Sequence, residues 1–165
     1  GRDKLANFFR KGSNRVRALV FVDDIFGSGN QKSGALKKLN SELGNLIADQ
    51  DIKVYITAIC GLEDGIRQIE RISQKAKFDT EVYAVHGLTE SDKCFSKNTN
   101  FFASDSNRRE AKQIAKKHGK NLDKKQPLGY QESELLVVFH DNCPNNSLPI
   151  IWKETKDWSP LFARK

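Results

Sequence analysis

The stretch over residues 19–31, Leu-Val-Phe-Val-Asp-Asp-Ile-Phe-Gly-Ser-Gly-Asn-Gln, decides how this sequence is interpreted. Its apolar start, with Arg17 and Ala18 before it, is typical of a strand that is buried on both faces of a parallel sheet. The strand is predicted to end at the acid pair Asp23-Asp24. After a glycine-containing turn, apolar residues at three- and four-residue steps predict an amphipathic helix over residues 32–48: Leu36, Leu39, Leu43, Leu46 and Ile47.

The remaining sequence repeats this alternation of strand and helix. Further strands are predicted over residues 52–59, 81–85 and 134–139, and a second helix is predicted after the acidic start Glu63-Asp64. A basic helix is predicted over residues 108–118, with Ala111, Ile114 and Ala115 as its buried stripe and Gly119 as its cap. The pattern predicts an α/β fold with an open, mostly parallel sheet and flanking helices.

The length of 165 residues is that of a single compact domain, here residues 1–165. The chain contains no Met and begins with Gly1, so we expect it to be the C-terminal portion of a longer protein and only part of a complete domain. Leu5, Phe8 and Phe9 are spaced as one face of a short helix that would lead into the first strand.

The composition excludes several classes of protein. No apolar run is long enough for a membrane span, and no signal-peptide core is present. Cys60, Cys94 and Cys143 are far apart and odd in number, which argues against a disulfide framework or a zinc site and favours a cytoplasmic location. The net charge of +7 favours an anionic partner.

The turn after the acid pair is predicted to bind a phosphate group, because two glycines bring backbone N–H groups close to a ligand where a helix begins. The residues assigned to phosphate binding are Gly27, Ser28, Gly29, Asn30 and Gln31. Asp23 and Asp24 are assigned to the vicinal hydroxyls of a ribose and, through water, to Mg²⁺ as a candidate cofactor. The alternative is an ordinary turn beside two solvated acids.

This stretch resembles the PRPP-binding motif of the type I phosphoribosyltransferases, in which four apolar residues, two acids and an apolar pair precede a loop of hydroxyl residues and glycines. The resemblance implies a Rossmann-like fold in which the acids contact the ribose of PRPP (5-phosphoribosyl 1-pyrophosphate) and the loop holds its 5-phosphate. Gly27 stands where some purine-specific members place an aspartate as general base. No catalytic residue is therefore assigned, and glycosyltransferase activity stays open.

Residues 17–152 further resemble the divergent phosphoribosyltransferase-like domains of bacterial conflict systems. The similar segments are residues 21–29, residues 127–130 before the last predicted strand, and residues 144–149 leading to Trp152. The resemblance implies a role in antiviral defence, with the upstream part of the same protein or a partner subunit beside this chain.

Other polar and aromatic residues are weaker candidates. Tyr130, Asn145 and Asn146 could form a second wall of the pocket, or else serve core packing and a hydrogen-bonded turn. His86 and His140 lie at predicted strand ends without an evident acid-base partner, which favours a structural role.

A basic cluster over residues 108–125 supports a second hypothesis. On a helix, Arg109, Lys112 and Lys116 share one face, so they could follow a phosphate backbone. The alternative to a ligand-binding enzyme is therefore a catalytically inactive module that senses a nucleotide or binds nucleic acid through this helix.

Overall fold

The computed structural model describes residues 16–163, and the chain divides into two compact units, the first ending at Gly87 and the second starting at Leu88. The helix expected around Phe8 lies outside the described residues. That residues 1–165 act as one domain stays a prediction. None of the helices in the described ranges is both long and apolar enough to cross a membrane.

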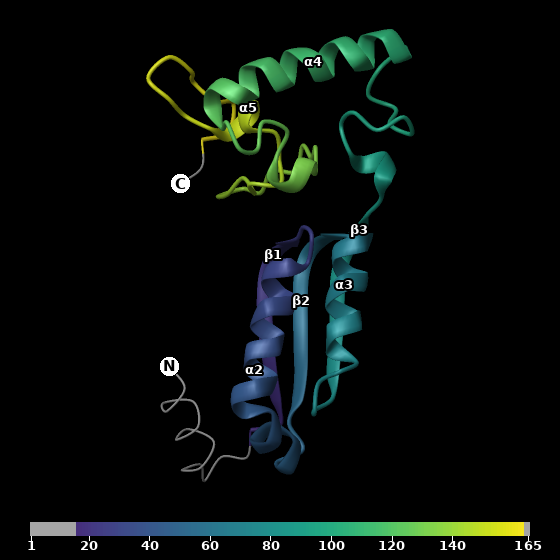
Figure 1. Cartoon of the computed structure of the whole chain (residues 1–165), viewed down its shortest axis with the longest axis vertical. Coiled ribbons are helices and arrows are strands. Elements are labelled where there is room, and N and C mark those ends of the chain that lie inside the picture. The colour runs from purple at the N-terminus through teal and green to yellow at the C-terminus, as the bar shows by residue number, and fades with distance from the viewer. Residues whose placement is uncertain (1–15, 164–165) are drawn as a thin grey trace. The chain divides into compact units, whose positions relative to one another are not determined.

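The first unit is a three-stranded parallel sheet with two helices (Figure 1). Its elements alternate in the order β1 (Ala18–Phe26), α2 (Asn30–Asp49), β2 (Lys53–Leu62), α3 (Glu63–Ser73) and β3 (Thr80–Leu88). The strands are ordered β1-β2-β3 across the sheet. The predicted α/β architecture is confirmed, and all three strands expected in this part of the chain are present.

The core of this unit lies between the sheet and its two helices. Right-handed crossovers in a sheet of this order place successive helices on the same face, and Figure 1 shows α2 and α3 together in front of the strands. The buried residues of this core are Phe26, Leu36, Leu43, Ile47, Ile52, Val54, Ile56, Ala58, Ile69 and Phe78.

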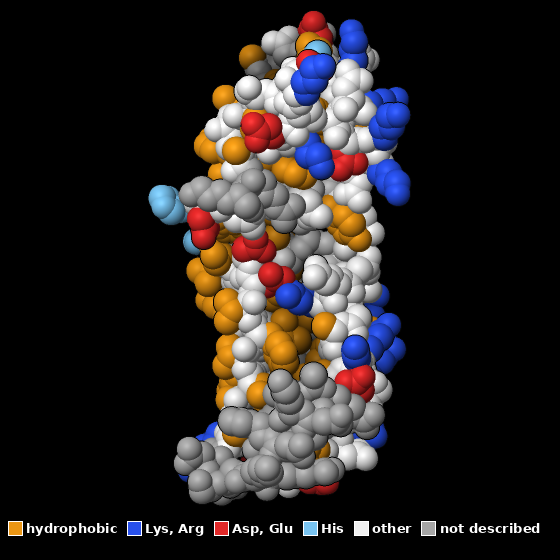
Figure 2. Space-filling model, turned by 90° about the vertical axis from the view of Figure 1, so that its left-hand side faces the viewer, with side chains coloured by type: hydrophobic (Ala, Val, Ile, Leu, Met, Phe, Trp, Pro, Cys, Tyr) orange, Lys and Arg blue, Asp and Glu red, His pale blue; other side chains and the backbone are white. Residues whose placement is uncertain are grey.

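The opposite face of the sheet is apolar but exposed, which corrects the prediction that the first strand is buried on both faces. Val20 of β1 is 59% exposed and Val22 is 75% exposed. Ile59, Tyr83 and Val85 on the neighbouring strands are also exposed. Hydrophobic side chains gather along the left-hand side of Figure 2. The prediction failed because the described helices cover only one side.

Strand β1 also continues beyond Asp23-Asp24, where the sequence predicted its end. Ile25 pairs with Cys60 and Phe26 pairs with Gly61 of β2. Phe26 is 1% exposed. Burial of its apolar side chain favours continuing the strand past the two acids. The acid pair therefore lies within the strand.

The second unit contains little regular structure besides one long helix. Its elements are η1 (Glu90–Asp92), α4 (Asp105–Leu122), η2 (Tyr130–Glu132) and α5 (Pro149–Trp152). A separate apolar core holds it together, formed by Cys94, Phe95, Ala115, Leu128 and Leu148.

The strand predicted over residues 134–139 is absent, and this segment makes only an isolated bridge between Leu135 and Ser147. Glu134 has φ 53°, which ends any extended conformation at the start of the segment. Local bonds then take up its backbone groups: the Ser147 hydroxyl donates to the carbonyl of Val137 at 2.6 Å, and the amide of Phe139 donates to the carbonyl of Asn142.

Helix α4 is longer than predicted, and of its predicted buried stripe Ala111 and Ala115 pack against the core whereas Ile114 does not. Ser104 caps it by accepting a hydrogen bond from the amide of Asn107. Ile114, expected in the core, is 53% exposed, whereas Ala115 and Gly119 are buried. A Cβ at Gly119 would collide with the carbonyl oxygen of Pro127. Gly119 therefore permits close packing within the helix and does not end it.

We expect Gly119→Ala to destabilise the second unit by about 1–3 kcal/mol, because the new methyl group meets rigid backbone. Ile114→Ala on the same helix is the control and should change stability by less than about 0.5 kcal/mol, because Ile114 is exposed. Amide hydrogen exchange along α4 measures both effects. Equal protection of α4 in the two variants would contradict this account of the packing.

Candidate phosphate- and ribose-binding site

The pairing of β1 with β2 shows which face of the sheet Asp23 lies on. Asp23 lies opposite Ala58, a residue of the core between sheet and helices. Asp23 therefore faces the helices.

Asp23 forms an ion pair with Lys32, whose Nζ lies 2.6 Å from its Oδ2. The side chains are 28% and 23% exposed, respectively. Lys32 lies in the first turn of α2, directly after the β1–α2 loop, and it was not among the residues assigned to the site from the sequence. The sequence contains one signal for Lys32. Helices favour acidic residues in their first turn, so a lysine at this position suggests that an anion lies nearby.

Asp24 has a different set of contacts. Its Oδ1 accepts a hydrogen bond from the amide of Ile25 at 2.8 Å, and its carbonyl oxygen accepts a weak one from the thiol of Cys60 at 3.9 Å. Burial, together with the charge of Asp24, raises the pKa of Cys60 to about 11. The Cys60 thiol therefore stays protonated at neutral pH, which argues against a nucleophilic role.

The loop between β1 and α2 has the backbone geometry that its glycines predict. Gly29 has φ 75° in the left-handed region and is the N-cap residue of α2. Because glycine has no side chain, it cannot cap the helix, and the first turn of α2 contains no acidic residue. The start of α2 therefore keeps its partial positive charge and directs backbone donors toward the loop.

Helix α3 supports this loop from the side. A Cβ at Gly65 would collide with the carbonyl oxygen of Gly27, and a Cβ at Gly29 would collide with the carbonyl oxygen of Gly65. The side-chain nitrogen Nε2 of Gln68 also lies 3.5 Å from the side-chain oxygen Oδ1 of Asn30. The loop conformation is thus fixed by backbone of the next helix, a contact that no sequence pattern predicts.

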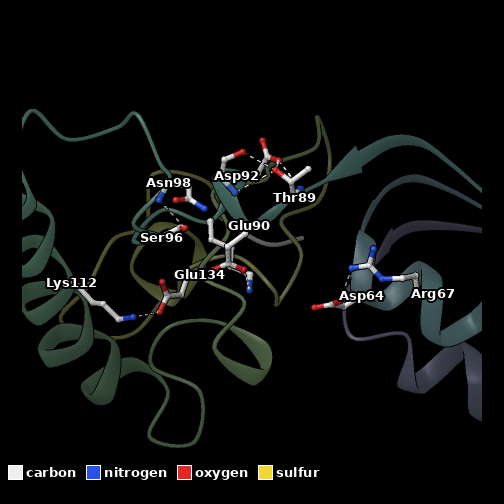
Figure 3. A network of polar contacts seen from close by, with 11 residues as sticks. Asp64, Arg67, Thr89, Glu90, Asp92, Ser96, Asn98, Lys112 and Glu134 are labelled. Atoms are coloured by element: carbon white, nitrogen blue, oxygen red, sulfur yellow. Dashed lines mark hydrogen bonds and ion pairs between the residues drawn. The ribbon is translucent and has the colours of Figure 1, made fainter.

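The first turn of α3 also carries a charged cluster. Arg67 donates to Asp64 at 2.8 Å (Figure 3) and to Glu63 at 3.3 Å. All three side chains are at least half exposed, so these pairs contribute little to stability. The positive charge of Arg67 offsets part of the negative charge of the two acids beside the β1–α2 loop.

The candidate residues of the second unit lie together but are mainly bound to one another. The amide of Tyr130 donates to the carbonyl of Asn145 at 2.8 Å. Asn146 is 5% exposed, and its Nδ2 and carbonyl oxygen both lie within hydrogen-bond distance of the Ser133 hydroxyl. These contacts favour a structural role for Asn146, while Asn145 is exposed.

The three cations of the proposed basic stripe on α4 are each close to an acid. Lys112 contacts Glu134 at 2.5 Å, as Figure 3 shows. Arg109 lies 3.7 Å from Asp105, and Lys116 lies 3.9 Å from Glu132. Neighbouring acids reduce the attraction of a cation for a phosphate backbone, so this geometry weighs against the nucleic-acid hypothesis.

The remaining titratable candidates show no catalytic grouping. His86 and His140 are exposed, and Cys94 and Cys143 are buried. Within residues 16–163, no three His, Cys, Asp or Glu side chains gather as a metal site. Mg²⁺ generally needs only one or two protein carboxylates beside substrate phosphates, and the acid pair of β1 has that chemistry.

A parallel α/β sheet whose first strand carries an acid pair and ends in a glycine loop at a helix start is the arrangement expected of a phosphoribosyltransferase-like domain. The model of the PRTase-CE family matches residues 3–164, and the chain belongs to this family. No curated protein and no solved structure matches the chain. The predicted phosphoribosyltransferase-like fold is confirmed, whereas the link to bacterial conflict systems stays a prediction.

We expect Gly65→Ala to displace the loop, because its methyl group would occupy the place of the Gly27 carbonyl oxygen. The free energy of unfolding should fall by about 1–3 kcal/mol. The control is Gly34→Ala in α2, where a Cβ meets no atom within 4 Å and should stabilise the helix by about 0.5–1 kcal/mol. Chemical denaturation would give both values, and a Gly65→Ala variant as stable as wild type would show that the contact is not rigid.

Proposed function

We propose that this domain binds a 5-phosphoribosyl compound, such as PRPP or a nucleoside monophosphate, at the β1–α2 loop. The observation that carries the proposal is the combination of Asp23-Asp24 with the left-handed Gly29 at the start of α2, in a chain of phosphoribosyltransferase-like family. In open α/β sheets, ligands generally bind at the carboxyl ends of the strands, which is where this loop lies.

The phosphate is assigned to the loop of Gly27, Ser28, Gly29, Asn30 and Gln31. Backbone N–H groups at a helix start favour an anion both through hydrogen bonds and through the partial charge of the helix. The absence of an acid in the first turn of α2 supports this assignment, because a carboxylate there would compete with the phosphate.

The ribose hydroxyls are assigned to the carboxylates of Asp23 and Asp24, which are acceptors when ionised. Mg²⁺ is proposed as a cofactor that these carboxylates would help to hold. When bound, it would neutralise charge on the phosphates of the ligand.

If PRPP is the ligand, the reaction class is cleavage or transfer at the anomeric carbon as pyrophosphate departs. In that reaction the protein mainly positions the groups and neutralises charge. Gly27 leaves the loop without a general base, so we propose ligand binding as the function and assign no acceptor. A setting in bacterial antiviral defence is proposed on the sequence resemblance alone.

Asp23→Asn combined with Asp24→Asn should abolish Mg²⁺-dependent binding of PRPP, because both acceptors for the ribose hydroxyls lose their charge. Ser28→Ala should weaken binding by about 1 kcal/mol, the scale of one hydrogen bond. Isothermal titration calorimetry with PRPP and a nucleoside monophosphate measures both effects.

The control for the double variant is Asp49→Asn combined with Asp51→Asn, which removes two charges at the turn between α2 and β2. This turn lies at the other end of the sheet from the loop, so PRPP affinity should stay as in wild type. Equal affinity of wild type and the Asp23/Asp24 double variant for PRPP would refute the proposed site.

A further inference from the structure

We propose that Lys32 is a positioning residue that makes the site select compounds carrying both a ribose and a phosphate over free phosphate. The inference rests on the proposed function of the β1–α2 loop and deepens it. It concerns how the two halves of the ligand are recognised together.

The ion pair of Lys32 with Asp23 is the first observation. The two groups are 2.6 Å apart, and about three quarters of each side chain is removed from water. Such a pair is screened less by solvent and salt than an exposed one, so separating it without a replacement partner is costly.

The place of Lys32 in its helix is the second observation. Lys32 is the third residue of α2, in the same turn whose backbone N–H groups are assigned to the phosphate. A lysine side chain is flexible and carries three donors. Lys32 can therefore serve either Asp23 or a phosphate bound at the helix start.

The residue after Lys32 is a further unusual feature of this turn. Ser33 is 3% exposed, and its hydroxyl has no hydrogen-bond partner within the ranges that the structure describes. Buried hydroxyls are generally paired, so the first turn of α2 holds an unsatisfied polar group in the ligand-free protein.

These contacts make Asp23 and phosphate competitors for Lys32. Free phosphate must separate Lys32 from Asp23 and leaves that carboxylate half-buried and alone. A ribose 5-phosphate compound takes Lys32 with its phosphate and gives Asp23 the sugar hydroxyls in exchange. The ion pair thereby lowers the affinity for inorganic phosphate, but it does not lower the affinity for ligands that carry both a phosphate and a ribose.

The test uses inorganic phosphate and ribose 5-phosphate as probes, with backbone amide NMR shifts of Gly29 and Asn30 to locate binding. Asp23→Asn should raise the affinity for inorganic phosphate about tenfold, because Lys32 is released, and should lower the affinity for ribose 5-phosphate. Lys32→Gln should lower the affinity for ribose 5-phosphate about tenfold, and Lys32→Arg should restore most of it.

Three controls separate this role from simple charge effects. Asp24→Asn removes the adjacent charge but leaves the ion pair of Lys32 with Asp23 in place, and should not raise phosphate affinity. The variant combining Asp23→Asn with Lys32→Gln should lose the gain seen with Asp23→Asn alone. Lys37→Gln, on an exposed position of α2, should bind both probes as wild type does.

The outcomes distinguish this inference from the function on which it rests. If wild type binds ribose 5-phosphate and Lys32→Gln binds it with the same affinity, the role of Lys32 is overturned and the proposed function is not. A phosphate gain that persists when Lys32 is also replaced would overturn it too, because repulsion by Asp23 would then explain the gain. Failure of wild type to bind PRPP or ribose 5-phosphate, with a Lys32-dependent phosphate gain in Asp23→Asn, would overturn the proposed function and keep the competition.

Discussion

The parallel pairing of β1 with β2 is the interaction on which the rest of the first unit depends. Its register places Leu19 beside Val54, and both pack in the core against α2 and α3. The same register turns Asp23 toward the helices, where Lys32 can reach it. Because the strand continues to Phe26, the chain enters the loop from a fixed point, and α3 then holds the loop through Gly65.

Each unit pairs a helical lysine with a carboxylate, but the two pairs differ in their surroundings. Asp23 keeps about a quarter of its side chain exposed, whereas Glu134, the partner of Lys112, is 7% exposed. The backbone of Glu134 is left-handed, and its carbonyl accepts a hydrogen bond from the amide of Cys94. Glu134 is thus fixed by the packing of its loop, while Asp23 stays accessible to a ligand.

Periodic patterns predicted the elements of the first unit because those elements depend on local apolar spacing. The string Phe21 to Gln31 likewise predicted a tight turn at the helix start, because glycine readily adopts the left-handed conformation that Gly29 has. The contact between Gly29 and Gly65 could not be predicted, because it joins residues far apart in sequence through backbone atoms. Residues 134–139 have strand composition, yet the positive φ of Glu134 and side-chain bonds to Val137 override it. Lys32 was missed because a single lysine has no periodicity.

The exposed apolar face of the sheet has a consequence for how the protein behaves in concentrated solution. β1 lies at one edge of the described sheet, and its Val20, Phe21 and Val22 are 59%, 43% and 75% exposed. An uncharged, apolar edge of this kind favours strand-to-strand association between molecules. The net charge of +7 opposes that association through mutual repulsion, which dissolved salt weakens. Colloidal stability is therefore tied to ionic strength, so the low-salt conditions that keep molecules apart are also those in which anions bind this chain most strongly.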